Sequence, residues 1–109
     1  MHDFAGGSYG DETADGSHPT GQLLLASDGN LYGTCYNGGE LKSYSDGAGT
    51  VFQLSPTTGA YATVKRFAAD SKDAAEPYSG LVQGTDGALY GSALNGGVGW
   101  GALYKLALP

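Results

Sequence analysis

The side chains that could perform nucleophilic chemistry are few and poorly spaced for it. A nucleophilic Ser or Cys needs a neighbouring base and a third group that orients this base. The only histidines are His2 and His18, both near the start, and the single cysteine, Cys35, lies in an apolar stretch without the Cys or His companions of a zinc site. Neither His-Glu-x-x-His nor the phosphate loop Gly-x-x-x-x-Gly-Lys occurs. We predict that the chain is not an enzyme, that it holds no cofactor, and that Cys35 is a buried small apolar residue.

Two groups of acidic residues raise the question of a metal site. Calcium takes six to eight oxygen ligands, and carboxylates are hard oxygen donors. Neither group has the Asp-x-Asp-x-Asp-Gly spacing of a calcium loop. We therefore interpret both groups as solvated acidic loops and predict no metal site. The residues are Asp11, Glu12, Asp15, Asp70, Asp73 and Glu76.

A mixture of aromatic and amide side chains favours ligand binding over catalysis. A sugar ring stacks on an aromatic face while amides bind its hydroxyl groups, which suits a concave site with few polar anchors. Trp100 stands between two glycines, so its face is a candidate for such stacking; the alternative is that Trp100 packs between repeat units. The candidate ligand-binding residues are Trp100, Tyr36, Asn37, Tyr44 and Asn95.

These candidates are positioned by a sequence that occurs twice. Residues 28–34 read Asp-Gly-Asn-Leu-Tyr-Gly-Thr, and residues 86–92 read Asp-Gly-Ala-Leu-Tyr-Gly-Ser, 58 positions later (86 − 28 = 58). Asp15 and Pro19 precede Asp73 and Pro77 by the same 58 positions. The Asp-Gly pair is typical of a hairpin turn, with Gly29 and Gly87 free to adopt positive φ. The chain is therefore two copies of one unit.

The sequence of each copy predicts short strands. Twenty glycines among 109 residues disfavour long helices, and eight Tyr favour strands. We predict polar loops over residues 5–18 and 68–76, each ending at a proline. Tyr32 and Tyr90, at mid-strand, are predicted to lie in the core. The predicted strands are residues 22–26, 31–36, 50–54 and 61–67 in the first copy, and 81–83, 89–94 and 102–106 in the second.

The second copy lacks a fourth strand, and the start of the chain supplies a candidate. Met1–Phe4 leads into an acidic loop and a proline, as Val64–Phe67 does. A repeat of this length with four short strands is typical of a β-propeller blade. We predict an all-β, propeller-type single domain over 1–109 with a circularly permuted N-terminal strand. Repeat one covers 5–67, and repeat two covers 68–109 together with strand 1–4.

The motifs resemble a known family repeat. Its pattern is carried in copy one by Phe4, Asp15, Pro19, residues 28–34, Gly38-Gly39 and the Gly-Thr-Val-Phe-Gln-Leu of residues 49–54. Copy two departs mildly, with Ser92 in place of Thr and Ala-Leu-Tyr-Lys-Leu at residues 102–106. The chain resembles the GloVer (Gloeobacter/Verrucomicrobia) tandem repeat over nearly its whole length. This resemblance implies a repeat scaffold of secreted or surface-anchored bacterial proteins, hence an extracellular or cell-surface location, and it transfers no catalytic residues.

Charge and hydropathy exclude several partners. The net charge is −6, with five Lys and Arg against eleven Asp and Glu. Nucleic acid and anionic membranes attract basic surfaces, so neither is an expected partner. No segment approaches the ~18 apolar residues of a membrane span, and no signal peptide is recognisable.

Two blades do not close a propeller, which typically has ~4–8. We therefore expect a homo-oligomer of three or four chains, in which Met1–Phe4 completes a neighbour's blade beside residues 102–106; a fragment of a longer propeller is the competing interpretation. The predicted function is a non-enzymatic binding module, most specifically a lectin-like module for glycans. The alternative is a purely structural repeat of a bacterial surface or secreted protein.

Overall fold

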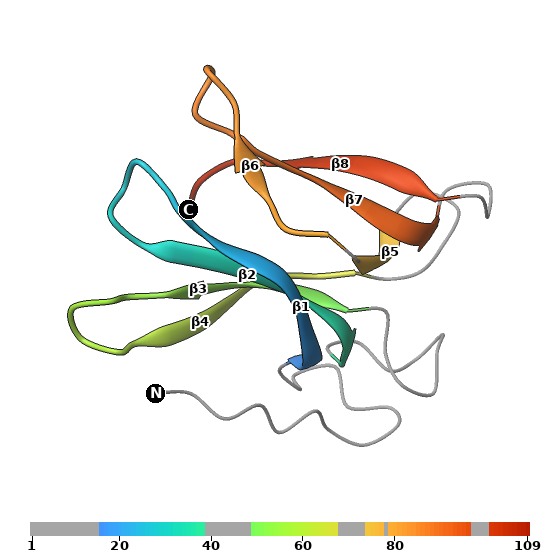
Figure 1. Ribbon diagram of the computed structural model, residues 1–109, viewed down its shortest axis with the longest axis horizontal. Coiled ribbons are helices and arrows are strands. Elements are labelled where there is room, and N and C mark those ends of the chain that lie inside the picture. The colour runs from blue at the N-terminus through green and yellow to red at the C-terminus, as the bar shows by residue number, and fades with distance from the viewer. Residues whose placement is uncertain (1–15, 39–48, 68–73, 78, 97–100) are drawn as a thin grey trace.

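The computed structural model describes residues 16–38, 49–67, 74–77, 79–96 and 101–109. These residues form only strands and turns, arranged as two stacked antiparallel sheets (Figure 1), which confirms the all-β class. The first sheet has β1 (Gly16–Leu25), β2 (Leu31–Gly38), β3 (Thr50–Leu54) and β4 (Tyr61–Arg66), paired in chain order. The second sheet has β5 (Ala74–Pro77), β6 (Val82–Gln83), β7 (Leu89–Gly96) and β8 (Ala102–Leu106).

The two sheets are versions of one design, because β5 and β6 together correspond to β1. Pro77 pairs with Ala93 and Val82 pairs with Tyr90, so β5 and β6 follow the same edge of β7, while β8 follows the other edge. In the first sheet the β1–β2 register shifts between Thr20 and Leu24, at the place where β5 and β6 separate. The second sheet therefore has three strand positions in the described part of the chain.

The predicted loops 5–18 and 68–76 are wrong at their C-terminal ends, where the structure has strands. Residues 16–18 and 74–76 are extended and pair with β2 and β7. Proline was interpreted as a boundary, yet β1 and β5 lie at sheet edges, where a missing N–H is tolerated. The strands thus continue through both prolines.

The Asp-Gly turns have the predicted hairpin geometry. In the first sheet, the Gly29 N–H donates to the Ala26 carbonyl and the Ala26 N–H donates to the Asn30 carbonyl, both at 3.0 Å, and Gly29 has φ 86°. Gly87 in the second sheet has the same φ and the equivalent bonds. Such loops, closed by a residue in the left-handed region, set the register of the paired strands.

The predicted fourth strand of the second unit, Met1–Phe4, lies outside the described residues. Within the described part of the chain, β8 pairs with β7 alone. The first sheet shows what this edge would receive, since β4 pairs along β3 at the equivalent place. The exchange of Met1–Phe4 therefore stays a prediction.

Side chains alternate across each strand, so each sheet has two faces. We call the face with Tyr32 in the first sheet, and with its equivalent Tyr90 in the second, the front face, and we call the opposite face the back face. The front face of the first sheet packs on the back face of the second. The buried core contains Ala26, Tyr32, Val51 and Phe67 from the first unit and Leu81, Leu89 and Ala93 from the second.

An aromatic contact completes the packing between the sheets. The rings of Phe67 and Tyr104 meet edge to face with centroids 5.0 Å apart, which joins the end of β4 to β8. Cys35 is fully buried in β2 on the back face of the first sheet, outside this core, in agreement with its predicted role as a small apolar residue. The core therefore lies between the two sheets rather than within either one.

Candidate functional site

The predicted ligand-binding residues do not form a described site. Trp100 and Tyr44 lie outside the described residues. Tyr36 and Asn37 are half-buried in β2, which includes Tyr36 as predicted and continues through Asn37. Consecutive strand residues point to opposite faces, so these two side chains cannot line one face together. Asn95 occupies the equivalent place in β7, where it pairs with Ala75.

The described residues add no candidate for a catalytic or metal site. Among the described residues, no three His, Cys, Asp or Glu side chains gather in a way that would hold a metal ion. The acidic residues 11, 12, 15, 70 and 73 lie outside the described ranges. Residues 6–10, also outside, read Gly-Gly-Ser-Tyr-Gly, which spells Gly-x-Ser-x-Gly. That spelling marks a nucleophile only where a strand turns into a helix.

The turn carboxylate of the first copy organises a buried polar group. The Tyr32 hydroxyl donates to Asp28 Oδ2 at 2.6 Å and accepts a bond from Gln53 Nε2 at 2.9 Å. The Asn30 N–H donates to Asp28 Oδ1 at 3.0 Å. The bond from Tyr32 and then that from Asn30 lower the pKa of Asp28. Burial, followed by the bond to Asp28, raises the pKa of Tyr32 to about 12.

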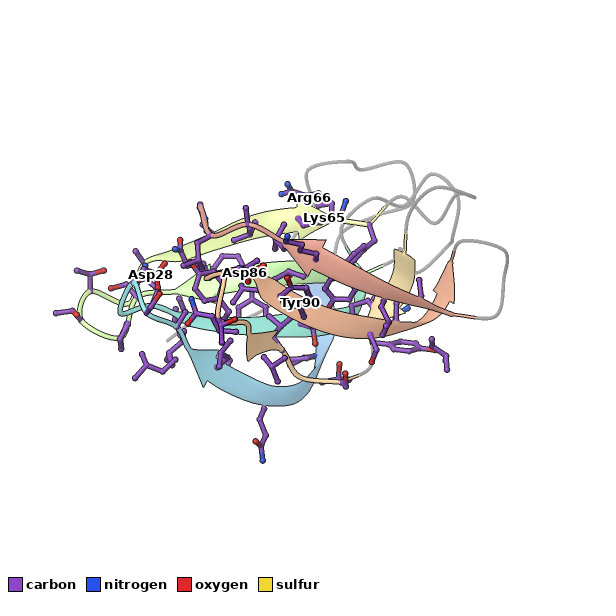
Figure 2. The ribbon with its side chains drawn as sticks, turned by 90° about the horizontal axis from the view of Figure 1, so that it is seen from above. Asp28, Lys65, Arg66, Asp86 and Tyr90 are labelled. Carbon is purple, nitrogen blue, oxygen red and sulfur yellow. The ribbon has the colours of Figure 1, made fainter. Side chains whose placement is uncertain are left out.

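The second copy repeats this arrangement at the surface. The Tyr90 hydroxyl donates to Asp86 Oδ2 at 2.6 Å, and Lys105 Nζ lies 3.4 Å from the same oxygen, where the first copy has Gln53. The bond from Tyr90 lowers the pKa of Asp86, and the bond to Asp86 raises the pKa of Tyr90. Figure 2, seen from the side of the second sheet, labels Asp86 and Tyr90. The aspartates thus have the predicted structural role in the turns, and they also bind the tyrosine hydroxyls, which the sequence did not predict.

Tyr90 corrects one sequence prediction. Tyr32 is fully buried, as expected of a core residue, but Tyr90 is partly exposed and lies outside the core. The reason is that Tyr90 lies on the front face of the second sheet, and no described element packs there. Identical motifs therefore occupy different environments.

Hydrogen bonds across the sheet–sheet contact fix how the two units meet. Thr34 Oγ1 donates to the Ser79 carbonyl, and Thr20 Oγ1 donates to the Pro77 carbonyl, both at 3.3 Å. At the turns, the Ser27 N–H donates to Gln83 Oε1, and Gln83 Nε2 donates to Ser27 Oγ, both at 2.9 Å. The contact has one orientation, because these partners are not interchangeable between the sheets.

Two glycines allow the backbones to approach at this contact. A Cβ placed on Gly21, which has φ 74°, would lie 2.8 Å from Gly80 Cα, and a Cβ on Gly80 would lie 3.1 Å from the Gln22 carbonyl oxygen. A side chain at Gly21 would therefore force the units apart. The segments around residues 21 and 80 therefore form a close backbone contact between the sheets.

The large apolar side chains left exposed gather on the two faces that the stack leaves uncovered. Leu23 and Leu25 lie on the back face of the first sheet. Val82, Leu94 and Leu103 lie on the front face of the second sheet. These five are the large exposed apolar residues of the described part of the chain. The front face also holds a shallow pocket of about 260 Å³, lined in part by Ser79, Tyr90, Ser92 and Leu103.

Equivalent residues show what the uncovered faces lack. Leu81 is 6% exposed in the contact, whereas its first-copy equivalent, Leu23, is 52% exposed. Val51 is fully buried, whereas its second-copy equivalent, Leu103, is 87% exposed. Sequence reasoning predicted that two blades leave open faces for assembly, but it did not name the residues of this surface. Apolar residues at the same alternating positions of both copies indicate that each sheet has two apolar faces, and this pattern could have identified the surface.

The comparisons with known proteins identify the family. The model of the Gloeobacter/Verrucomicrobia repeat matches residues 2–109. The chain therefore belongs to this repeat family. Neither the curated proteins nor the solved structures contain a match. No helix among the described residues is long and apolar enough to cross a membrane.

Proposed function

We propose that this protein is a non-enzymatic module that builds a propeller-type scaffold by joining further copies through its two uncovered faces. The observation that carries the proposal is the front-to-back stack of the two sheets, which leaves one back face and one front face exposed with apolar residues on both. Apolar patches of this kind mark interaction surfaces. A heterologous contact repeats from copy to copy until the rotation closes a ring.

The size of the ring follows from the number of sheets. Propellers close with ~4–8 blades, so three chains would supply six and four chains would supply eight. The outer edge of β8 is open in the described part of the chain, and Met1–Phe4 of a neighbour is the strand that we propose for it. Backbone pairing there would satisfy the β8 groups that face away from β7. The setting that we propose, from what the resemblance to this repeat implies, is a bacterial secreted or surface protein.

Glycan binding is the ligand class that we propose for the assembled scaffold. Tyr36 and Asn37 at the end of β2 are half-exposed, and an asparagine recurs at the equivalent sequence position, residue 95 of β7. A glycan array probed with the wild-type chain tests this class. Loss of the signal in Trp100→Ala or Tyr36→Ala supports it, and an array with no signal contradicts it.

The solution mass of the purified chain, measured by light scattering after size-exclusion chromatography, tests the scaffold proposal. We expect the mass of three or four chains across a range of concentrations. A monomer at every concentration would contradict the proposal. The glycan array is a separate test, because a ring without a ligand leaves the scaffold proposal intact.

A further inference from the structure

We propose that the front-face pocket of the second sheet receives the 19–23 segment of β1 from the next copy. This inference rests on the scaffold proposal and names the surfaces that join the chains. The template is the contact within one chain, in which the front face of the first sheet receives the 77–81 segment that precedes β6. Residues 77–81 correspond to residues 19–23 through the 58-residue offset.

Each hydrogen-bonding residue of the contact within the chain has an equivalent at the proposed contact between chains. Thr34 Oγ1 donates to the Ser79 carbonyl within the chain. Ser92 is the equivalent of Thr34, and Gly21 is the equivalent of Ser79, so the Ser92 hydroxyl would donate to the Gly21 carbonyl of the next copy. Ser92 now shares a 2.8 Å bond with the Ser79 hydroxyl at the wall of the pocket. The Ser92 hydroxyl therefore already lies at the wall of the pocket that would receive the next copy.

Burial points to the same occupant. Pro77 is fully buried at the internal contact, while Pro19 is exposed. Leu81 is buried, while Leu23 is half exposed. The 19–23 segment therefore offers the exposed counterparts of the residues that fill the internal contact. The pocket on the receiving face is lined in part by Val82 and Leu103, the counterparts of Leu24 and Val51.

The contact between chains is more apolar than the contact within one. Inside the chain, Ser27 and Gln83 exchange two hydrogen bonds. The corresponding positions of the contact between chains are Thr85 and Leu25, which cannot reproduce that exchange because Leu25 has no polar atom in its side chain. Leu25 is exposed in the single chain, as an interface leucine would be before assembly.

Disulfide trapping tests which surfaces meet. Gly21 and Gln22 lie against Gly80 within the chain, so the offset places Ser79 of one copy against Gln22 of the next. Ser79→Cys and Gln22→Cys would be made as separate chains in a Cys35→Ala background, because Ala93 is the natural equivalent of Cys35. Both substituted positions are exposed. The two chains are mixed, oxidised and run on a non-reducing gel.

We expect a disulfide-linked dimer in the mixture and little in either chain alone, since a head-to-tail contact brings residue 79 to residue 22 and not to itself. Thr57→Cys, exposed in the β3–β4 turn, replaces Gln22→Cys as the matched control and should give no dimer with Ser79→Cys. The solution mass of the Cys35→Ala background is measured first. An oligomer without the 22–79 dimer overturns this inference and leaves the scaffold proposal standing, whereas a monomer overturns both.

A second variant tests the receiving face without cysteine chemistry. Leu103→Asp places a carboxylate in the proposed contact. The fold of the single chain should not change, because Leu103 is almost fully exposed there. We expect the oligomer mass to fall to that of one chain with an unchanged far-ultraviolet spectrum. Retention of the full oligomer by this variant would overturn the inference.

Discussion

The first sheet buries its front face, whereas the second sheet buries its back face. The two units share their turn motif, strand order and tyrosine–aspartate pair, yet Leu23 and Val51 have exposures opposite to those of their equivalents Leu81 and Leu103. Burial in this molecule is therefore decided by which neighbour a sheet has and not by the repeat itself. Predictions about the repeat must be made in pairs, with each residue tested against its equivalent.

The largest difference is expected between Val51→Asp and Leu103→Asp. Val51 is fully buried between the sheets, so an aspartate there would be a buried charge without a partner, which costs several kcal/mol. Domains of this size have ~5–15 kcal/mol of stability in total. We expect Val51→Asp to be largely unfolded in circular dichroism and Leu103→Asp to keep its spectrum. Equal loss of structure in both variants would break the comparison.

The next difference concerns the tyrosine hydroxyls. Tyr32→Phe removes a buried hydroxyl that bonds a carboxylate and an amide, so we expect a loss of ~1.5–3 kcal/mol in the free energy of unfolding. Tyr90→Phe removes the equivalent bond at the surface, where water replaces it, and should cost less. Urea titrations of both variants measure the difference. A larger loss for Tyr90→Phe would show that the second copy is covered in solution.

Alkaline pH should act through the buried tyrosines. The pKa values of Tyr32 and Tyr104 are raised to about 12 from the ordinary value of 10.0. Between these values the unfolded chain loses protons that the folded chain keeps, so stability falls as the pH rises from about 10 to about 12. Urea midpoints across this range measure the loss. Tyr32→Phe should flatten the decline, and an unchanged decline in this variant would contradict the assignment to Tyr32.

The smallest effect is expected for Tyr104→Phe. The Tyr104 hydroxyl is buried and has no hydrogen-bond partner among the residues that the structure describes, and the equivalent residue of the first copy is Phe52. Removing an unsatisfied buried hydroxyl relieves its desolvation cost, so we expect a change between zero and a gain of ~1 kcal/mol. Thermal unfolding of Tyr104→Phe beside the wild type measures this change. A clear loss of stability would show that the hydroxyl has a partner in solution.

Much of the strand pattern could be predicted from the sequence. Thr50–Leu54 and Ala102–Leu106 have the predicted bounds, because alternation and turn residues define both ends. Gly16–His18 and β5 were missed, since polar residues before a proline resemble a loop. Pairing with β2 and β7, a tertiary effect, extends these residues into strands.

The covered and uncovered faces could not be predicted. Alternation along β2 and β7 separates two faces in each copy, but it does not say which face meets the other sheet. Tyr90 was placed in the core for this reason, although the same motif at Tyr32 was placed there correctly. The candidate ligand residues stay a prediction: Tyr36 and Asn37 belong to β2 and face opposite ways, while Trp100 and Tyr44 lie outside the described residues.

The front-to-back stack restricts the number of blades that a ring of whole chains can contain. Each chain carries two sheets that face the same way round, so any ring made of whole chains contains an even number of sheets. Five- and seven-bladed rings are then forbidden by parity, whatever the strength of the contacts. The joints also alternate around such a ring between the polar Ser27–Gln83 kind and the apolar Leu25–Thr85 kind. Because the two blades of one chain are covalently joined, such a ring would come apart into pairs of blades.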